Sequence, residues 1–406
     1  MISFVRKRIL RFDVLVLFIL QKTNQSYQVC LDEFLTGLSK IPTKGSLSTA
    51  RSQLCYKVFK RLNLLINNIF YTKSSYHKWK GMRILAVDGS TLKLPNHNSL
   101  NNKFSKHYFG AKANVGHWMS RISYLYDVLN GTVIDAQMES FDTSEATLCK
   151  AHLPFIKKGD LVIFDRYYAS YELMGILMGK GVEFLFRMRK KSWKCVDEFI
   201  ASEEKEKIVT LQLPKKCTYL LRTYVHLTDT LTIRLVKKKN RKGDIQVFAT
   251  SLLDTDKYPA KSITNLYKKR WGIEEAYKLI KSRLEVADFS GKTLQAVQQD
   301  FYAKTMLLSL SAVLSFKVNP KVKGLPSRKK KETRDRKMML NRTYIIYRTK
   351  KLIEQLHHNI ETLDNMLDVF ITKIQSKIEY SRKGQSVPRK IKKGINTLHV
   401  MSYKVI

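Results

Sequence analysis

Between residues 83 and 187, short strand patterns and helical patterns follow one another in an order that few folds can accommodate. Arg83 to Val87 is a short apolar strand pattern, and Arg121 to Val128 alternates like a half-buried strand. Asn130 and Gly131 suit the two positive-φ positions of a type I′ turn, after which Thr132 to Ala136 returns. The pattern therefore predicts three antiparallel strands at the start of this region.

Helical and strand patterns then alternate. Ser144 to Leu153 suits a helix, and Leu161 to Phe164 is a short apolar strand. Tyr171 to Lys180 is again helical, and Glu183 to Arg187 is a further strand. Three antiparallel strands followed by helix, strand, helix and strand is the order of a ribonuclease-H-like domain, an α/β fold with a mixed sheet flanked by helices. We predict that fold for two core segments, residues 81–191 and 254–316.

The other stretches are predicted to interrupt or flank this core. Residues 192–253 are rich in strand patterns and predict an all-β insertion, with one of its strands at Thr218 to Val225. Residues 1–80 predict a helical N-terminal DNA-binding region, and a helical packing domain with ordinary surface lysines fits the same pattern. Residues 317–406 predict a basic linker and a helical C-terminal region, with a long helical stretch from Tyr344 to roughly Tyr380 and a basic tail.

The charge of the chain narrows the class of its partner. Lys and Arg number 74 against 34 Asp and Glu, which leaves a formal net charge of +40. Such a balance favours a polyanionic partner, because each cation set against a phosphate releases condensed counterions. Anionic membranes and ribosomal RNA satisfy the charge as well as DNA does, so the charge alone does not name an activity.

Cysteine usage and one apolar run bear on the compartment. The five cysteines contain no C-x-x-C pair, which argues against a disulfide framework and against a Cys-based zinc site. The run from Val14 to Leu20 follows several arginines like the core of a signal peptide, but it is short and Gln21 and Lys22 follow it directly. We therefore expect a buried helix there, and a cytoplasmic protein without a membrane partner.

Two aspartates directly follow strand patterns. Asp88 follows the strand that begins at Arg83, and Asp165 follows the strand that ends at Phe164. Adjacent strands would bring both side chains to the same edge of a sheet. Phosphoryl transfer on DNA uses two divalent cations about 4 Å apart, for which carboxylates are natural ligands. Either aspartate alone is weak evidence, because Asp is common in the turns that follow strands.

A third acidic candidate lies in a predicted helix further along the chain. At about 100° per residue, Tyr267, Arg270, Glu274 and Lys281 fall on one stripe if the helix is continuous. Such a stripe of charged side chains is typical of a functional site. The same spacing is also typical of a solvent-exposed helix face with Glu-to-Lys ion pairs. The neighbouring Glu275 points elsewhere, so Glu274 is the better ligand candidate.

Together these residues resemble a known signature. The helix reproduces the Y-x2-R-x3-E-x6-K pattern of the fourth insertion-sequence family of bacterial DDE transposases. Ala86 to Thr91, which contains Asp88, resembles the first aspartate motif of that family, and Phe164 to Tyr168 resembles the second. The family also carries a β-rich insertion between its second aspartate and its glutamate. The resemblance therefore covers roughly residues 1–310 in organisation.

The resemblance implies a cut-and-paste transposase, a nucleotidyltransferase and endonuclease that acts on DNA phosphodiesters. Asp88, Asp165 and Glu274 would be the catalytic residues and would bind two Mg²⁺ ions, with Mn²⁺ as a substitute. Water would attack the phosphodiester at the element end, and the freed 3′ hydroxyl would then attack a second phosphodiester. In some relatives this second attack forms a hairpin on the element end, and in others it proceeds differently. Terminal inverted repeats and target DNA would be the ligands of a nucleoid-associated homodimer, with Tyr344 to Tyr380 as one place for its interface.

The resemblance also implies residues that contact DNA. Arg270 would bind a DNA phosphate with two nitrogens of its guanidinium, and Lys281 would bind one as a point charge. Tyr267 would contact a phosphate through its hydroxyl. Trp271 would stack on a displaced base, although a Trp beside a helix start is more often core. Two rival functions are a catalytically inactive or repurposed sequence-specific DNA-binding protein of this fold and a nuclease that only hydrolyses. The intact carboxylates disfavour the first rival, and the complete helix signature disfavours the second.

Overall fold

The computed structural model describes residues 9–21, 25–109, 114–239, 243–320, 338–358 and 361–380. The chain divides into two compact units. We call Met1–Asn68, Leu92–Ser120 and Lys278–Ile406 the terminal unit, and Ile69–Thr91 and Arg121–Tyr277 the central unit. The three carboxylates singled out by the sequence all belong to the central unit.

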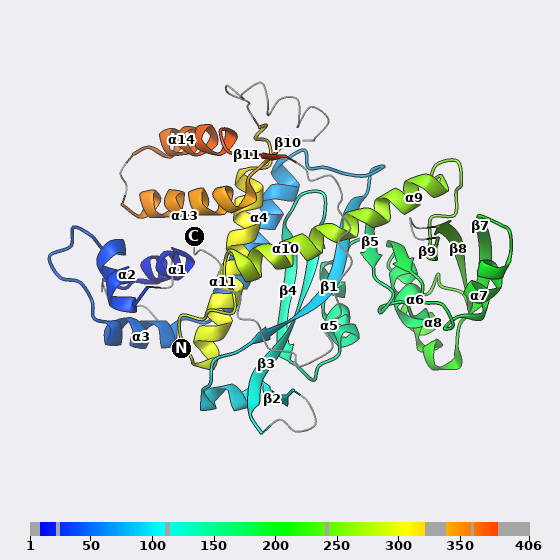
Figure 1. Ribbon diagram of the computed structural model, residues 1–406, viewed down its shortest axis with the longest axis horizontal. Helices are drawn as coiled ribbons and strands as arrows, with labels where there is room; N and C mark the ends of the chain where they lie inside the picture. The colour runs from blue at the N-terminus through cyan, green and yellow to red at the C-terminus, as the bar shows by residue number, and fades with distance from the viewer. Residues whose placement is uncertain are drawn as a thin grey trace. The chain divides into compact units, whose positions relative to one another are not determined.

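The described residues contain a nine-stranded sheet with the order β2-β3-β1-β5-β6-β9-β8-β7, in which β4 also pairs with β3 (Figure 1). Its strands are β1 (Arg83–Lys93), β2 (Ser105–Tyr108), β3 (Gly116–Asp127), β4 (Val133–Ser140), β5 (Asp160–Phe164), β6 (Glu183–Arg187), β7 (Glu206–Gln212), β8 (Thr230–Lys239) and β9 (Ile245–Thr250). β1, β5 and β6 are parallel neighbours, and β7, β8 and β9 pair antiparallel. The predicted mixed sheet is therefore confirmed.

β1, β3 and β4 form the antiparallel part of this sheet. Val128 N donates to Ile84 O at 3.1 Å and Leu94 N donates to Trp118 O at 2.8 Å, so β3 runs opposite to β1. The predicted hairpin between β3 and β4 is present, but its turn is not type I′.

In that turn Gly131 alone has positive φ, at 77°, and Asn130 does not. The reason is the side chain of Asp127, whose Oδ1 accepts the N–H groups of Leu129 and Asn130 at 2.9 and 3.0 Å. This carboxylate turns the chain while Asn130 keeps an ordinary backbone conformation.

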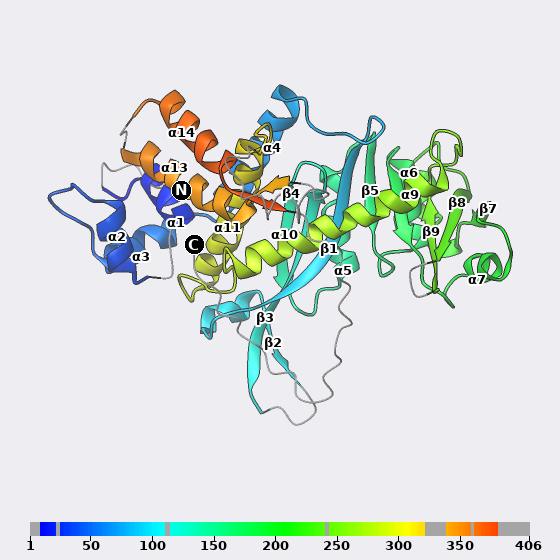
Figure 2. The ribbon, with the colours of Figure 1, turned by 45° about the horizontal axis from the view of Figure 1, so that its top comes forward.

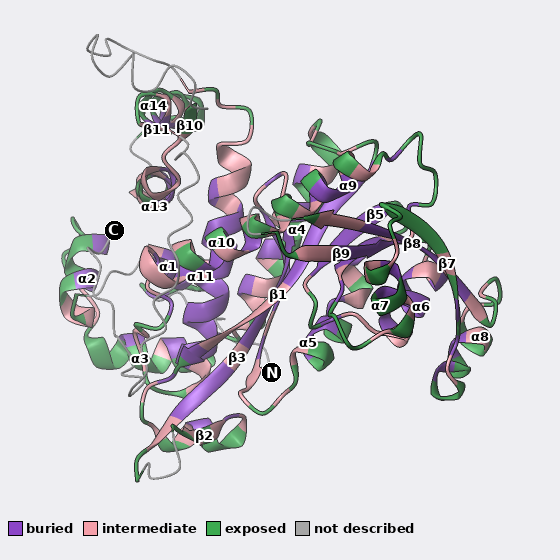
Figure 3. Cartoon of the chain, turned by 45° about the vertical axis from the view of Figure 1, so that its right-hand side comes forward, coloured by how far each residue is buried: buried purple, intermediate pink, exposed green. Residues whose placement is uncertain are grey.

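Helices cover both faces of the central sheet (Figure 2). Two of them, α5 (Glu145–Ala151) and α6 (Tyr171–Gly179), pack on the face formed by residues such as Val162 and Phe164. α9 (Ala260–Tyr267) packs Ile263 and Leu266 against the opposite face, which carries Ile84 and Ile163. Alternate residues of one strand face opposite sides, so the two cores are separate. Figure 3 shows these strands as buried.

Residues 192–253 contain helices as well as strands, which corrects the all-β prediction. α7 (Lys194–Ala201) precedes β7, and the predicted strand Thr218 to Val225 is instead the short helix α8 (Tyr219–Thr223). The helix forms because Leu220 packs tightly on α6, where a Cβ on Gly175 would lie 2.8 Å from the Leu220 Cδ1 atom. β9 pairs with β6, so the strands of this stretch extend the central sheet.

Most of the remaining helices lie in the terminal unit. The N-terminal ones are α1 (Phe12–Gln21), α2 (Tyr27–Phe34), α3 (Lys44–Gln53) and α4 (Lys57–Lys73), the last of which continues into the central unit. Further along the chain are α11 (Leu294–Leu314), α13 (Arg342–His358) and α14 (Leu363–Gln375). The apolar run of α1 is buried, which confirms that prediction. No helix in the described parts of the chain has the length and apolarity needed to cross a bilayer.

The predicted long helix from Tyr344 to Tyr380 is instead two helices followed by a strand. α13 ends at His358, α14 begins at Leu363, and β11 (Ile378–Tyr380) pairs with β10 (Met338–Leu340). Thr362 starts the second helix because its side chain accepts the N–H of Asn365, a typical N-cap. The predicted linker at 321–337 and the basic tail after 380 lie outside the described residues.

A buried ion pair fixes α3 on α11 within the terminal unit. Arg51 Nη2 lies 2.5 Å from Asp300 Oδ1, and both side chains are almost inaccessible to solvent. Gln299 completes the contact by accepting from Arg51 Nε at 2.6 Å and donating to the Arg51 carbonyl at 2.9 Å. The removal of one partner of such a pair leaves an uncompensated buried charge, so this contact specifies how the N-terminal helices dock.

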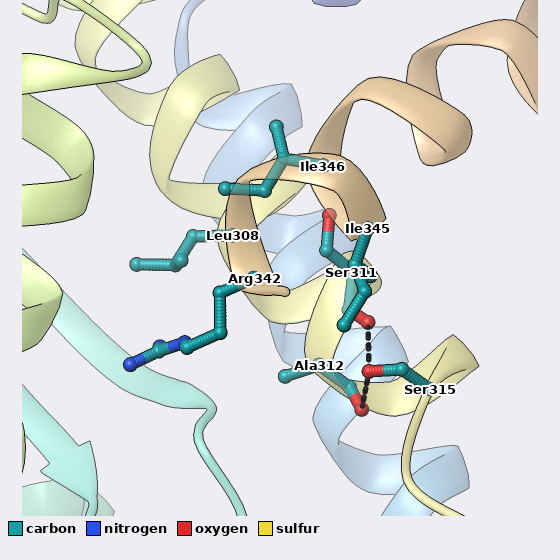
Figure 4. A pocket seen from close by; sticks show the side chains of 7 residues that line it. All are labelled: Leu308, Ser311, Ala312, Ser315, Arg342, Ile345 and Ile346. Carbon is teal, nitrogen blue, oxygen red and sulfur yellow. Dashed lines mark hydrogen bonds between the residues drawn. The ribbon is translucent and has the colours of Figure 1, made fainter. Parts of the chain in front are cut away.

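A small pocket lies between α11 and α13 in the same unit (Figure 4). Its lining is largely apolar and includes Leu308 and Ile345, with Arg342 at one side. Its two serines already donate to carbonyls of their own helix, Ser311 to Leu307 at 2.7 Å and Ser315 to Ser311 at 2.8 Å. The pocket therefore presents little chemistry beyond packing.

Candidate active site

The register of two parallel strands places Asp88 beside Asp165. β1 pairs with β5 from Arg83 opposite Asp160 to Ala86 opposite Ile163, a constant offset of 77 residues. Carried two residues past this pairing, and one past the end of β5, the same offset would set Asp88 opposite Asp165. Both aspartates fall on the face of the sheet that carries Ala86 and Ile163, because successive side chains alternate. That face is the one covered by α9.

A buried ion pair stabilises this register at the start of both strands. Arg83 Nε donates to Asp160 Oδ1 at 2.9 Å, and its Nη2 donates to Oδ2 at 2.6 Å. The two side chains are almost fully buried. The bidentate geometry fixes both position and orientation. Because the pair lies five residues before each aspartate, it sets which residues meet at the far end of the strands.

Glu274 is linked to Asp88 by Arg270. α10 (Trp271–Ser282) begins directly after a 3₁₀ turn, η4 (Lys268–Arg270). Nη1 of Arg270 lies 3.6 Å from Asp88 Oδ2, and its Nη2 donates to Glu274 Oε1. All three side chains keep some solvent access, and the side chain of Asp88 is 21% exposed. The guanidinium therefore bridges two of the three predicted carboxylates.

The three carboxylates share one electrostatic environment. The pKa of Asp88 is raised to about 6, chiefly by burial and in smaller part by the negative charges of Asp165 and Glu274. The positive charge of Arg270 and the hydrogen bond from the Gly89 N–H act in the opposite direction. Such Coulombic effects require proximity, so Asp165 and Glu274 lie within electrostatic range of Asp88.

The donor chemistry of this cluster fits divalent cations. Magnesium prefers carboxylate oxygens on rigid elements. Here the carboxylates come from the middle of β1, from the residue after β5 and from α10, so Asp88 lies within its strand and not at the predicted strand end. Among the described residues, no three His, Cys, Asp or Glu side chains are already arranged around a common metal position. Arg270 contacts two of the carboxylates, so the guanidinium supplies the positive charge nearest to them in this structure.

Two hydroxyl groups fix the backbone of Asp88, and the sequence analysis singled out neither. Tyr277 Oη donates to the Asp88 carbonyl oxygen at 2.7 Å, and Ser123 Oγ donates to it at 3.2 Å. The ring of Tyr277 stacks on Tyr124 of β3, with 4.9 Å between centroids. Tyr277 follows Glu274 by three residues, and this helical spacing was the available signal. Ser123 gave no comparable signal, since it is one small residue within a strand.

The helix signature is not one continuous helix. α9 ends at Tyr267, and η4 separates it from α10, which corrects the assumption of a single stripe. The turn winds more tightly than an α-helix, and Arg270 still reaches Glu274 one turn later. The ring of Tyr267 lies 4.8 Å from that of Phe248 and is partly buried. Burial raises its pKa, against the positive charges of Arg270 and Arg187, and the charge of Asp165 adds to the rise.

Trp271 and Lys281 differ in their surroundings. Trp271 is 54% exposed at the start of α10, so it is not the core residue that a Trp at this position often is. Lys281 lies near the other end of the same helix, where burial lowers its pKa. The structure thus gives one solvent-facing aromatic surface beside Arg270.

Comparison with known proteins identifies the family. Residues 79–310, more than half of the chain, match the Transposase DDE domain family. The transposase InsG for insertion sequence element IS4 of Escherichia coli strain K12 is 20% identical over 330 residues, which cover 79% of this chain and 73% of that protein. The chain belongs to the DDE transposases, and it is an enzyme of DNA transposition related to the IS4 transposase.

The chain also shows a more distant similarity to a solved structure. The cryo-EM structure of the piggyBac transposase synaptic complex with hairpin DNA aligns over 93% of this chain and 76% of that one, with 11% identity and a TM-score of 0.42. The family assignment stands on the sequence match. DDE transposases use divalent metal ions and act on DNA, in agreement with the carboxylate cluster and the net charge of +40.

Proposed function

We propose that Asp88, Asp165 and Glu274 hold two Mg²⁺ ions, for which Mn²⁺ substitutes, and that the chain cuts and rejoins DNA at the ends of an insertion sequence. The observation that carries this proposal is that Arg270 contacts both Asp88 and Glu274, while the pairing of β1 with β5 directs Asp165 toward Asp88. When bound, the cations supply an activated attacking oxygen and stabilise the leaving oxygen.

The residues around the carboxylates bind and orient the DNA. Arg270 turns its fork to a phosphate near the cleaved bond once it leaves Asp88 and Glu274, because a planar guanidinium suits phosphate as well as carboxylate. Tyr267 and Lys281 contact neighbouring phosphates. Trp271 offers its exposed indole face to a base displaced from the duplex.

The DNA partners are the terminal inverted repeats of the element and the target duplex. The net charge of +40 supports a phosphate-dominated interface, to which the helical N-terminal region, residues 1–80, contributes DNA contacts. A homodimer holds the two ends together, because both must be cut and joined to one target. The stretch from Tyr344 to Tyr380 is one place for its interface.

The test of this proposal is the pair of variants Glu274→Gln and Glu275→Gln. Both remove one negative charge from adjacent positions of α10, and Glu275 is exposed. Glu274→Gln removes a metal ligand with little change of shape, so we expect DNA cleavage to be lost while DNA affinity stays within about twofold, because few phosphate contacts change.

The cleavage assay uses the genomic DNA that flanks the reading frame as substrate and Mg²⁺ as the cation. We expect the control variant Glu275→Gln to cleave this DNA like the wild type. Unchanged cleavage by Glu274→Gln would refute the assignment of the site.

A further inference from the structure

A buried chain of polar side chains ends on the backbone of Asp88. Asp135 Oδ2 lies 2.7 Å from His152 Nδ1, and His152 Nε2 lies 3.0 Å from Ser123 Oγ. Ser123 Oγ then donates to the carbonyl oxygen of Asp88 at 3.2 Å. The three residues come from β4, from the residue that follows α5 and from β3, so three elements meet behind the aspartate.

The order Asp, His and Ser is that of a nucleophilic triad, but burial excludes that use. Ser123 and His152 are fully buried, and Asp135 is nearly so. A nucleophile must reach its substrate, and this serine cannot. Its hydroxyl is directed to a backbone carbonyl instead. The chain of hydrogen bonds therefore acts on the protein itself.

The hydrogen bonds of this chain depend on one another. A serine hydroxyl has a single proton, so the bond from Ser123 to Asp88 depends on how Ser123 meets His152 Nε2. On its other side His152 Nδ1 lies against the carboxylate of Asp135, which also accepts from Gln137 Nε2 at 2.6 Å. Loss of any member leaves a buried polar atom without its partner, which is costly in a low dielectric.

We propose that Ser123, His152 and Asp135 are positioning residues that hold Asp88 in the orientation needed to bind a divalent cation. The inference rests on the proposed role of Asp88 as a metal ligand. The Asp88 carbonyl receives a second bond from Tyr277 Oη, so its peptide is fixed from β3 and from α10. A fixed peptide fixes the direction in which the side chain leaves the strand. Groups that orient a metal ligand set its affinity nearly as strongly as the ligand itself.

The experiment compares Ser123→Ala with Ser120→Ala in the full chain. Both serines lie on β3 and are fully buried, so the two variants delete the same atom at the same degree of burial. The Ser120 hydroxyl has no hydrogen-bond partner among the described residues, whereas that of Ser123 joins His152 to Asp88. Binding of Mn²⁺ to the DNA-free protein is measured by electron paramagnetic resonance of the free ion.

We expect Ser123→Ala to bind Mn²⁺ about 10-fold more weakly than the wild type, and Ser120→Ala to bind it unchanged. A purely structural role for the relay would alter thermal stability and leave Mn²⁺ affinity alone. Asp135→Asn, which keeps the shape of the side chain, is the second variant if Ser123→Ala does not fold. We expect Asp135→Asn to weaken Mn²⁺ binding as well.

Asp88→Asn separates the two proposals. If Asp88→Asn binds Mn²⁺ like the wild type, Asp88 is not a ligand, and both the proposed site and the positioning role fail. If Asp88→Asn loses the ion while Ser123→Ala, or Asp135→Asn in its place, retains wild-type affinity, only the positioning role is overturned.

Discussion

Arg270 sets its guanidinium 3.6 Å from the Asp88 carboxylate and binds Glu274 with its other terminal nitrogen. One cation thus compensates two of three acidic groups that burial and mutual repulsion would otherwise drive apart. The same guanidinium is suited to a DNA phosphate. In the proposed function Arg270 would therefore couple cation binding at Asp88 and Glu274 to the presence of DNA, since it cannot serve both partners at once.

Replacing Arg270 by Gln should strengthen metal binding in the absence of DNA. The variant removes the cation that competes for Asp88 and Glu274, so we expect Mn²⁺ to bind several-fold more tightly, as a charge interaction of about 1 kcal/mol would give. Cleavage should fall, because the phosphate contact is lost. Isothermal titration calorimetry with Mn²⁺ measures the first effect.

The control is Lys269→Gln, which makes the same change of charge at the exposed neighbouring residue. Weaker Mn²⁺ binding by Arg270→Gln would contradict the idea that Arg270 competes with the cation for Asp88 and Glu274.

The raised pKa of Asp88 predicts a stability that depends on pH. Its folded pKa of about 6 exceeds the ordinary value of 3.8, so the folded state binds more protons between these values and loses stability as the pH rises through that window. The loss above pH 6 is at most about 3 kcal/mol, at 1.36 kcal/mol per pKa unit.

Asp88→Asn should therefore be more stable than the wild type at pH 7.5, with the difference vanishing near pH 4. Urea unfolding of the metal-free protein at both pH values measures the free energy of unfolding. Asp256→Asn, at an exposed position, controls for the general loss of a negative charge. An equal difference at both pH values would show that the carboxylate of Asp88 is not destabilised by its surroundings.

The pair Arg83 and Asp160 should contribute strongly to stability. Asp160→Asn leaves a buried guanidinium without its charge partner, which typically costs about 3–5 kcal/mol. Glu172→Gln breaks the more exposed pair with Lys150, for which about 1 kcal/mol or less is expected. Chemical denaturation of both variants measures the two costs. Comparable losses would mean that the buried pair does not hold the register of β1 and β5.

The parts of the site that follow from local pattern could be predicted from the sequence. Asp165 directly follows β5 as predicted, whereas Asp88 lies inside β1, which continues to Lys93; the spacing from Tyr267 to Lys281 singled out Glu274. The contact of Arg270 with Asp88 could not be predicted, because it joins segments far apart in the chain. Tertiary packing likewise overrides local propensity at Leu220, whose fit against Gly175 makes α8 a helix where the residues alone favour a strand.

The exposed indole of Trp271 predicts an effect on DNA distortion rather than on overall binding. A base stacked on an aromatic side chain gains about 1–3 kcal/mol, and every base offers a suitable face. Trp271→Ala should therefore abolish the fluorescence change of a 2-aminopurine placed at the element end, while Trp271→Phe retains part of it. Affinity for the same duplex should change little in either variant, because phosphate contacts dominate it. A wild-type signal from Trp271→Ala would assign the exposed ring to another contact, such as the dimer partner, since 54% of the side chain is open to solvent in the single chain.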